Sequence, residues 1–275
     1  LKYGARSATF GDARYPSVMI RNSLSLLLVL ACLGLCLDAD RASADWINLS
    51  GAENAPNVAE IYVLDDHIRL VLEVYVGELN RFEDLVPDDW LKGKARQRPS
   101  YPARMRRFSE TTFQFVTETG TRLQAQLERV EHRQRKDREA PFAGMINPFT
   151  RQALTQPPAD KRVLYAEIVY SFGNRRPRAL IIVPPLDAEG RALTTMGFIA
   201  FHKLVPITDF RNLDGPAHLR LNWEDPWESR FDNPGLKRHH SSALMSFLYV
   251  EPYEVRHEVL TRVKDLEQWM DLDLR

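Results

Sequence analysis

Apolar and polar residues alternate along much of the chain, which is the pattern of half-buried β-strands. In residues 68–76 every second side chain is apolar, while Arg69 and Glu73 fall on the opposite face. A short apolar run precedes this segment, and Asp65 and Asp66 lie between the two. The pattern therefore predicts a β-hairpin over residues 61–76.

The periodicity changes after this hairpin. Residues 78–86 place Leu79, Phe82 and Leu85 at helical spacing before a proline, so we expect a short helix there. The next segment, 92–107, is basic and contains two prolines, which favours a linker. Alternation then returns on both sides of Gly120 and predicts a second hairpin over residues 112–130.

Short strand patterns fill most of the remaining chain, with turn residues between them. They are 163–172, 179–183, 195–202, 205–210 and 218–223. Many short strands with little helix favour a mainly β fold, and we expect an antiparallel β-sandwich of the Ig-like or jelly-roll-like kind over residues 45–242. Residues 133–161 interrupt the pattern with charges and prolines, so we expect a long insert in this domain.

The end of the chain resembles the first hairpin and helix. With a constant shift of 187 residues, Tyr62 falls on Tyr249 and Arg69 on Arg256, and the apolar positions follow the same order. Two similar hairpins by chance are one explanation. We favour a repeat, in which residues 243–275 open a second, related unit and the sequence is a fragment of a longer protein.

The first part of the chain has the pattern of an export signal. Met19 and Arg21 precede an uncharged apolar run, and small residues follow it up to Ala44. This order is that of a secretory signal peptide, so we expect residues 19–44 to be cleaved after Ala44 from a periplasmic or secreted protein. A retained anchor or a buried helix is the alternative, but about 20 apolar residues are needed to span a bilayer.

The cysteines allow a second interpretation of the same leader. The residues up to Cys32 resemble a bacterial lipoprotein signal, and a lipid on Cys32 would tether the protein to a membrane. Both cysteines, Cys32 and Cys36, lie before Ala44, so the remaining chain has no disulfide and no cysteine metal ligand. Residues 1–18 precede Met19 and show no clear periodicity of apolar residues. We expect them to be upstream sequence translated in error.

Charge excludes one class of partner. The chain has 37 Lys and Arg against 37 Asp and Glu, so its formal net charge is zero. The net charge therefore gives no reason to expect nucleic-acid binding. Basic clusters at 104–107 and 133–136 are flanked by acids, which is typical of solvated faces.

The most unusual composition lies in residues 223–240. In one interpretation Trp223 and Trp227 stack on a sugar ring while Asp225 or a neighbouring acid binds its hydroxyls. In the other, which we favour, the segment is a long ordered loop in which the tryptophans cover the edge of the sandwich and the acids cap turns. The expected binding surface comprises this loop and the apolar part of the insert, namely Trp223, Asp225, Trp227, Arg230, Asp232, Phe142 and Phe149.

Histidines offer the main candidate metal ligands. His239, His240 and His257, with Asp232 nearby, have the donor types that bind zinc or copper. Adjacent histidines on a regular element point in different directions, and the H-E-x-x-H motif is missing. We therefore expect no cofactor.

The sequence favours a binding protein over an enzyme. It contains no nucleophile elbow, P-loop or dinucleotide fingerprint. Our first hypothesis is an exported, non-catalytic module of the cell envelope that binds a protein or glycan partner. The alternative is a metal-dependent or carboxylate-dependent hydrolase that uses Asp225, Asp232, His239 and His240.

Overall fold

The computed structural model describes residues 50–91, 98–138, 142–148, 150–173, 175–238, 242, 244–250, 252–267 and 269–271. All of them belong to one of the two units into which the chain divides, Asn48–Arg275. The expected upstream segment 1–18 and signal peptide 19–44, with Cys32 and Ala44, lie outside the described residues. Among those described, no helix is long and apolar enough to cross a membrane.

The described part of the chain is mainly β. Its strands are β1 (Asn57–Val63), β2 (His67–Tyr75), β3 (Gln114–Thr117), β4 (Ala125–Gln134), β5 (Arg162–Ser171), β6 (Ala179–Val183), β7 (Met196–His202), β8 (Val205–Pro206), β9 (Arg211–Asn212), β10 (Ala217–Arg220), β11 (Arg230–Phe231), β12 (Leu244–Val250) and β13 (Val255–Thr261). The predicted strands at 163–172, 179–183 and 195–202 are confirmed as β5, β6 and β7.

Short helical segments connect the strands. They are η1 (Ala52–Asn54), η2 (Val76–Leu85), η3 (Asp88–Trp90), α2 (Tyr101–Arg107), η5 (Phe108–Thr112), η6 (Pro226–Glu228), η7 (Pro234–Leu236) and α3 (Val263–Leu266). The helix expected after the first hairpin is present as the 3-10 helix η2.

The first predicted hairpin is confirmed. β1 and β2 pair antiparallel, ending at Val63 opposite Ile68. The turn between them is closed by the backbone N–H of Leu64, which donates to the His67 carbonyl at 2.9 Å. The apolar face of the hairpin is fully buried, because β1 and β2 are central strands.

The larger sheet has the strand order β4-β5-β2-β1-β7-β8, and β9 also pairs with β7. β1 and β7 run parallel, from Asn57 opposite Met196 to Val63 opposite His202. The expectation of a purely antiparallel arrangement is therefore wrong, and this sheet is mixed. The long connection between β1 and β7 allows the chain to return in the same direction.

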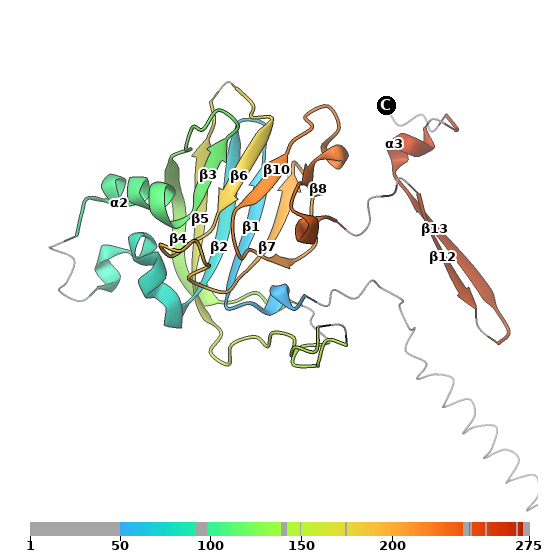
Figure 1. Ribbon diagram of the computed structural model, residues 1–275, viewed down its shortest axis with the longest axis horizontal. Coiled ribbons are helices and arrows are strands. Elements are labelled where there is room, and N and C mark those ends of the chain that lie inside the picture. Colours follow the sequence, from blue (N-terminus) through green and yellow to red (C-terminus); the bar gives the residue numbers. More distant parts are fainter. Residues whose placement is uncertain are drawn as a thin grey trace, which may run out of the picture. The chain divides into compact units, whose positions relative to one another are not determined.

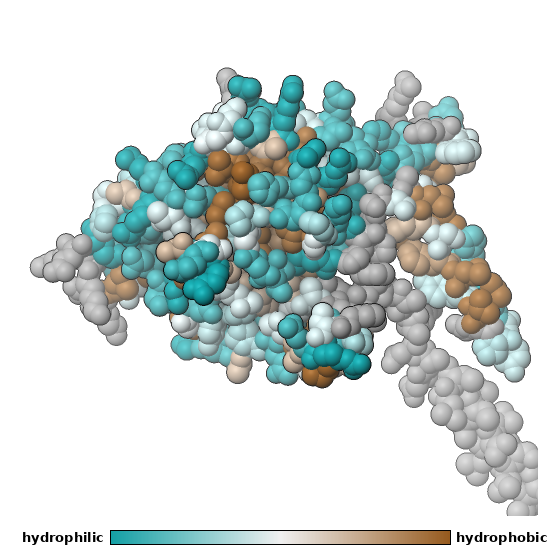
Figure 2. Space-filling model, viewed as in Figure 1, coloured by the Kyte–Doolittle hydropathy of each residue, from teal (hydrophilic) through white to brown (hydrophobic). Residues whose placement is uncertain are grey.

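A smaller antiparallel sheet has the order β11-β10-β6-β3. In Figure 1, β3, β6 and β10 lie in front of β5, β2 and β1. One hydrophobic cluster contains side chains of both sheets, among them Leu70 and Tyr170 from the larger sheet and Phe115, Ile182 and Leu219 from the smaller one. The face seen in Figure 2 is mostly hydrophilic over this main body.

The second predicted hairpin is right next to its turn and wrong beyond it. The Leu123 N–H donates to the Phe115 carbonyl at 2.9 Å, and a bridge joins Val116 to Arg122. Farther along, β3 pairs with β6, and β4 pairs with β5 in the other sheet. Alternation correctly indicates two strands, but it does not determine their partners.

The expected linker contains the helix α2. Pro102 lies in its first turn, where the missing N–H costs no intrahelical hydrogen bond. The helix is tied to η2 and the residues after it, because Arg107 pairs with Asp84 and buried Arg104 donates to the Val86 carbonyl at 2.9 Å. Proline at 102 therefore starts a helix here rather than preventing one.

The start of the insert is fixed to the outer face of β1 and β2. Arg138 donates to Glu73 at 2.8 Å and to Glu60 at 3.2 Å. Arg135, also buried, donates to the Ala55 carbonyl at 3.0 Å. β4 and β5 remain paired up to Gln134 opposite Arg162, so the insert begins later than predicted.

Candidate functional site

A cavity of about 480 Å³ lies beside the segment that follows β10. We call it the Trp227 cavity. Its lining residues are Ile207, Trp227, Glu228, Ser229, Arg230, Lys237 and Arg238. The structure thus brings together two of the residues predicted from sequence, Trp227 and Arg230.

Two side chains shape the backbone that leads to Trp227. The Asn222 carbonyl oxygen Oδ1 accepts hydrogen bonds from the backbone N–H groups of Glu224 and Asp225, both at 3.1 Å. Asp225 Oδ1 then accepts from the Trp227 N–H at 3.2 Å and caps η6. Asn and Asp are favoured at such positions because their short side chains bond to the nearby backbone.

Arg238 forms one wall of the cavity with Trp227. Its guanidinium lies 3.8 Å from the centroid of the indole. The same group donates to the Pro206 carbonyl at 2.8 Å and to the Trp227 carbonyl at 2.9 Å. Burial lowers the pKa of Arg238 from its usual value. The guanidinium therefore already occupies a position over the indole that a stacked sugar ring would need.

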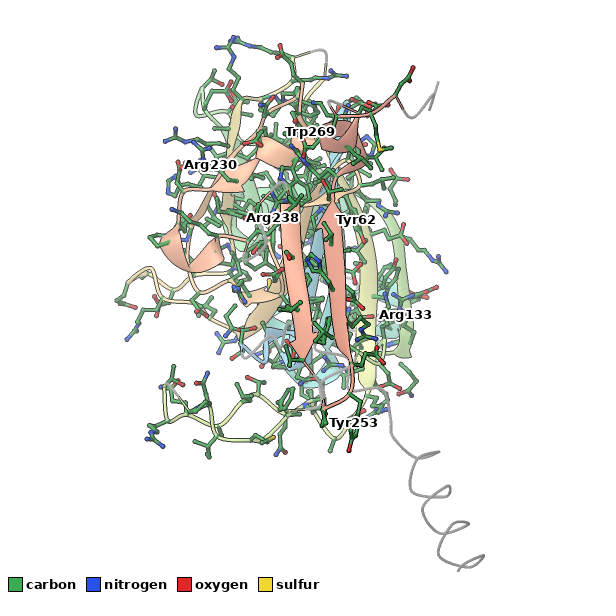
Figure 3. All side chains as sticks on the ribbon, turned by 90° about the vertical axis from the view of Figure 1, so that its right-hand side faces the viewer. Tyr62, Arg133, Arg230, Arg238, Tyr253 and Trp269 are labelled. Atoms are coloured by element: carbon green, nitrogen blue, oxygen red, sulfur yellow. The ribbon has the colours of Figure 1, made fainter. Side chains whose placement is uncertain are left out.

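The remaining polar lining is predominantly cationic. Arg230 and Lys237 are exposed, and the side chain of neither has a hydrogen-bonded or ion-paired partner among the described residues. Glu228 is the single carboxylate in the lining, against three cations. Arg230 and Arg238 are labelled in Figure 3. The arrangement attracts an anionic group.

A buried Ser–His pair lies behind the cavity, and sequence reasoning missed it. His202 Nδ1 is 2.7 Å from Ser229 Oγ, and that oxygen accepts from the Asn222 N–H at 2.9 Å. The imidazole also packs edge-on against Trp223. Burial lowers the pKa of His202 to about 4, so the ring is neutral at pH 7. The pair therefore links the loop that contains Ser229 to the end of β7.

The other polar candidates from the 223–232 segment already have partners. Trp223 Nε1 donates to the Pro177 carbonyl at 2.7 Å. Asp225 Oδ2 accepts from Lys264 at 3.0 Å, and this bond is the main reason why its pKa is lowered. Asp232 accepts from Arg220 at 2.8 Å. None of these three residues lines the Trp227 cavity.

The more distant candidates are not assembled at the cavity. Phe142 is half-buried in the insert and is not among the lining residues. Phe149, His239 and His240 lie outside the described residues. His257 is exposed on β13, where its Nε2 lies 2.6 Å from Ser246 Oγ.

Metal ligands do not cluster in the described part of the chain. There, no group of three or more His, Cys, Asp or Glu side chains could hold an ion. Asp225 and Asp232 each bind a cationic side chain instead. The hydrolase alternative therefore gains no support from the described residues.

Comparison with known proteins found no match for the chain among protein-family models, curated protein sequences or solved structures. The site is therefore interpreted from its own geometry.

Proposed function

We propose that the protein is an exported, non-catalytic module of the cell envelope. In this proposal the Trp227 cavity binds an anionic group of a protein or glycan partner. The observation that carries the proposal is the pair of exposed, unpartnered cations, Arg230 and Lys237, beside a single carboxylate, Glu228. Export is supported by the signal-peptide pattern of residues 19–44.

Charge supports the proposal better than stacking does. Trp223 is engaged by its hydrogen bond to Pro177, and Trp227 carries the guanidinium of Arg238. The indole of Trp227 supplies an apolar wall next to three cations. A carboxylate on a short apolar stem, such as a glutamate side chain or a uronic acid, matches such a lining.

The finer description of the fold is part of the same proposal. We infer that the mixed sheet and the smaller antiparallel sheet pack face to face as a β-sandwich of the Ig-like or jelly-roll-like kind. The hydrophobic cluster shared by the two sheets supports this arrangement. In such a fold, loops at the ends of the strands provide binding surfaces, and the Trp227 cavity lies in one of these loops.

Calorimetric titration with matched charged and neutral probes tests the function. The probes are oligogalacturonate and its full methyl ester, and polyglutamate and polyglutamine. We expect only charged probes to bind, with affinity falling as salt is raised. The charged probe with the lower dissociation constant identifies the class of partner: oligogalacturonate indicates a glycan, and polyglutamate indicates a protein.

The variant R230A/K237A should weaken binding of the charged probe about five- to thirtyfold, because two exposed ion pairs contribute about 1–2 kcal/mol together. R106A removes an exposed cation from α2 and should leave the affinity unchanged. Equal binding of charged and neutral probes, or equal affinities of R230A/K237A and R106A, would contradict the proposal.

A further inference from the structure

β12 and β13 repeat the pairing register of β1 and β2. A shift of 187 places β1, Asn57–Val63, on β12, Leu244–Val250. The register is the same, because Val63 pairs with Ile68 and Val250 pairs with Val255. The next element also begins at the equivalent position, since η2 starts at Val76 and α3 at Val263.

One side-chain pair occurs at the same place in both hairpins. Arg69 lies opposite Tyr62 across the ladder, with its guanidinium 4.6 Å from the ring centroid. Arg256 lies opposite Tyr249, and the corresponding distance is 4.4 Å. Side chains alternate along a strand. Each Tyr–Arg pair therefore lies on one face of its hairpin, and the apolar positions equivalent to Ile61, Val63, Ile68 and Leu72 lie on the other.

The two hairpins differ in what covers their apolar face. In the first hairpin Ile61, Val63, Ile68 and Leu72 are all 0% exposed. Their equivalents are exposed: Leu248 by 64%, Val250 by 73%, Val255 by 62% and Val259 by 50%. The hydrophobic colour over this hairpin is visible in Figure 2. A position after the hairpin shows the same contrast, because Phe82 in η2 is 0% exposed and its equivalent Trp269, in the turn after α3, is 87% exposed.

The first hairpin owes its burial to its neighbours. β7 pairs with the outer edge of β1, and β5 with the outer edge of β2. Side chains of the smaller sheet, such as Phe115 and Ile182, form one hydrophobic cluster with its apolar residues. β12 and β13 pair only with each other among the described strands. A lone two-stranded hairpin is marginally stable in water, and a row of exposed apolar residues marks an interaction surface.

We propose that β12, β13 and α3 are the opening elements of a second unit with the fold of the first. In the same polypeptide, strands of that unit equivalent to β7 and β5 pair with the free edges of β12 and β13, and a sheet equivalent to β3, β6 and β10 covers the apolar face. In a second copy of the described unit, β7 and β5 already pair with β1 and β2, so these strands are not free to pair with β12 and β13.

Hydrogen–deuterium exchange on the product of the complete reading frame tests this proposal. We expect the amides of residues 244–261 to exchange as slowly as those of residues 57–75, at every protein concentration. Fast exchange of the second hairpin would overturn the proposal. Protection that appears only at high concentration would also overturn it, because it would assign the surface to a second copy.

Two substitutions in the second hairpin sharpen the test. V259D places a charge on the apolar face and should accelerate exchange over 244–261 at least about tenfold, while exchange over 57–75 stays unchanged. Y253D places a carboxylate in the turn, where the first hairpin has the exposed Asp66, so it should change exchange by less than about twofold. Equal effects of V259D and Y253D would contradict the proposed covering of the apolar face.

Discussion

His202 Nδ1 lies 2.7 Å from Ser229 Oγ in the interior, and this contact joins the end of β7 to the loop that shapes the Trp227 cavity. Burial holds the pKa of the imidazole at about 4, below its ordinary value of 6.5. The neutral ring suits this site, because the described residues around it offer no carboxylate that bonds to it.

The first prediction concerns pH. Below pH 6.5 the unfolded chain binds a proton at His202 while the folded protein does not, so stability is lost as pH falls from 6.5 to about 4. The loss should reach roughly 2–3 kcal/mol. Urea unfolding of wild type and H202Q between pH 7.5 and 4.5 measures it, and H202Q should lack this part of the pH dependence. H218Q, which changes an exposed histidine, should behave as wild type; identical pH profiles for H202Q and wild type would refute the assignment.

The second prediction concerns the close approach of η1 to β7. A Cβ atom at Gly197 would lie 1.8 Å from the Ala52 carbonyl oxygen. G197A should therefore destabilise the protein by about 1–3 kcal/mol, the usual cost of overpacking. G215A adds the same methyl group in open space and should have little effect in thermal unfolding. A melting temperature of G197A equal to that of G215A would show that η1 does not contact β7 in this way.

The third prediction concerns the buried ion pairs of Glu73. Its carboxylate accepts from Arg138 at 2.8 Å, and both side chains are almost fully buried. E73Q should cost about 1–3 kcal/mol, because it removes one of the two counter-charges of a nearly buried guanidinium and leaves Glu60 at 3.2 Å as the other. E131Q removes the carboxylate of an exposed pair and should cost less than about 1 kcal/mol. Urea unfolding compares the two, and equal losses would show that Glu73 is not needed at this place.

The fourth prediction isolates one buried hydroxyl. Tyr170 OH donates to the Phe113 carbonyl at 2.9 Å across the shared core. Y170F leaves that carbonyl unsatisfied and should cost about 1–3 kcal/mol. Y101F removes an exposed hydroxyl and serves as the control in the same chemical unfolding series. A Y170F variant as stable as Y101F would mean that the bond contributes nothing.

Local patterns in the sequence predict the strands but not their neighbours. The β1–β2 hairpin was predictable because its turn and its alternation lie within one short segment. The parallel pairing of β1 with β7, and the separation of β3 from β4, depend on contacts between distant segments. α2 was missed because Pro102 was interpreted as a breaker, although a first-turn proline is compatible with a helix.

The candidate site was predictable in the same partial way. Unusual composition identified Trp227 and Arg230, which do line one cavity. Ser229 and His202 carried no sequence signal, because their contact requires β7 to lie beside the loop that precedes β11. Lys237 and Arg238 also line the cavity, but their sequence pattern does not distinguish them from other basic residues of the chain.

The parallel pair of β1 and β7 also has a consequence for biogenesis. A ribosome releases β1 long before it releases Met196–His202, so the outer edge of β1 has no partner while most of the polypeptide is being made. Such non-local pairing slows folding. The nascent chain therefore exposes an unpaired strand edge until β7 has been synthesised. During this time the edge can pair with other chains and lead to aggregation.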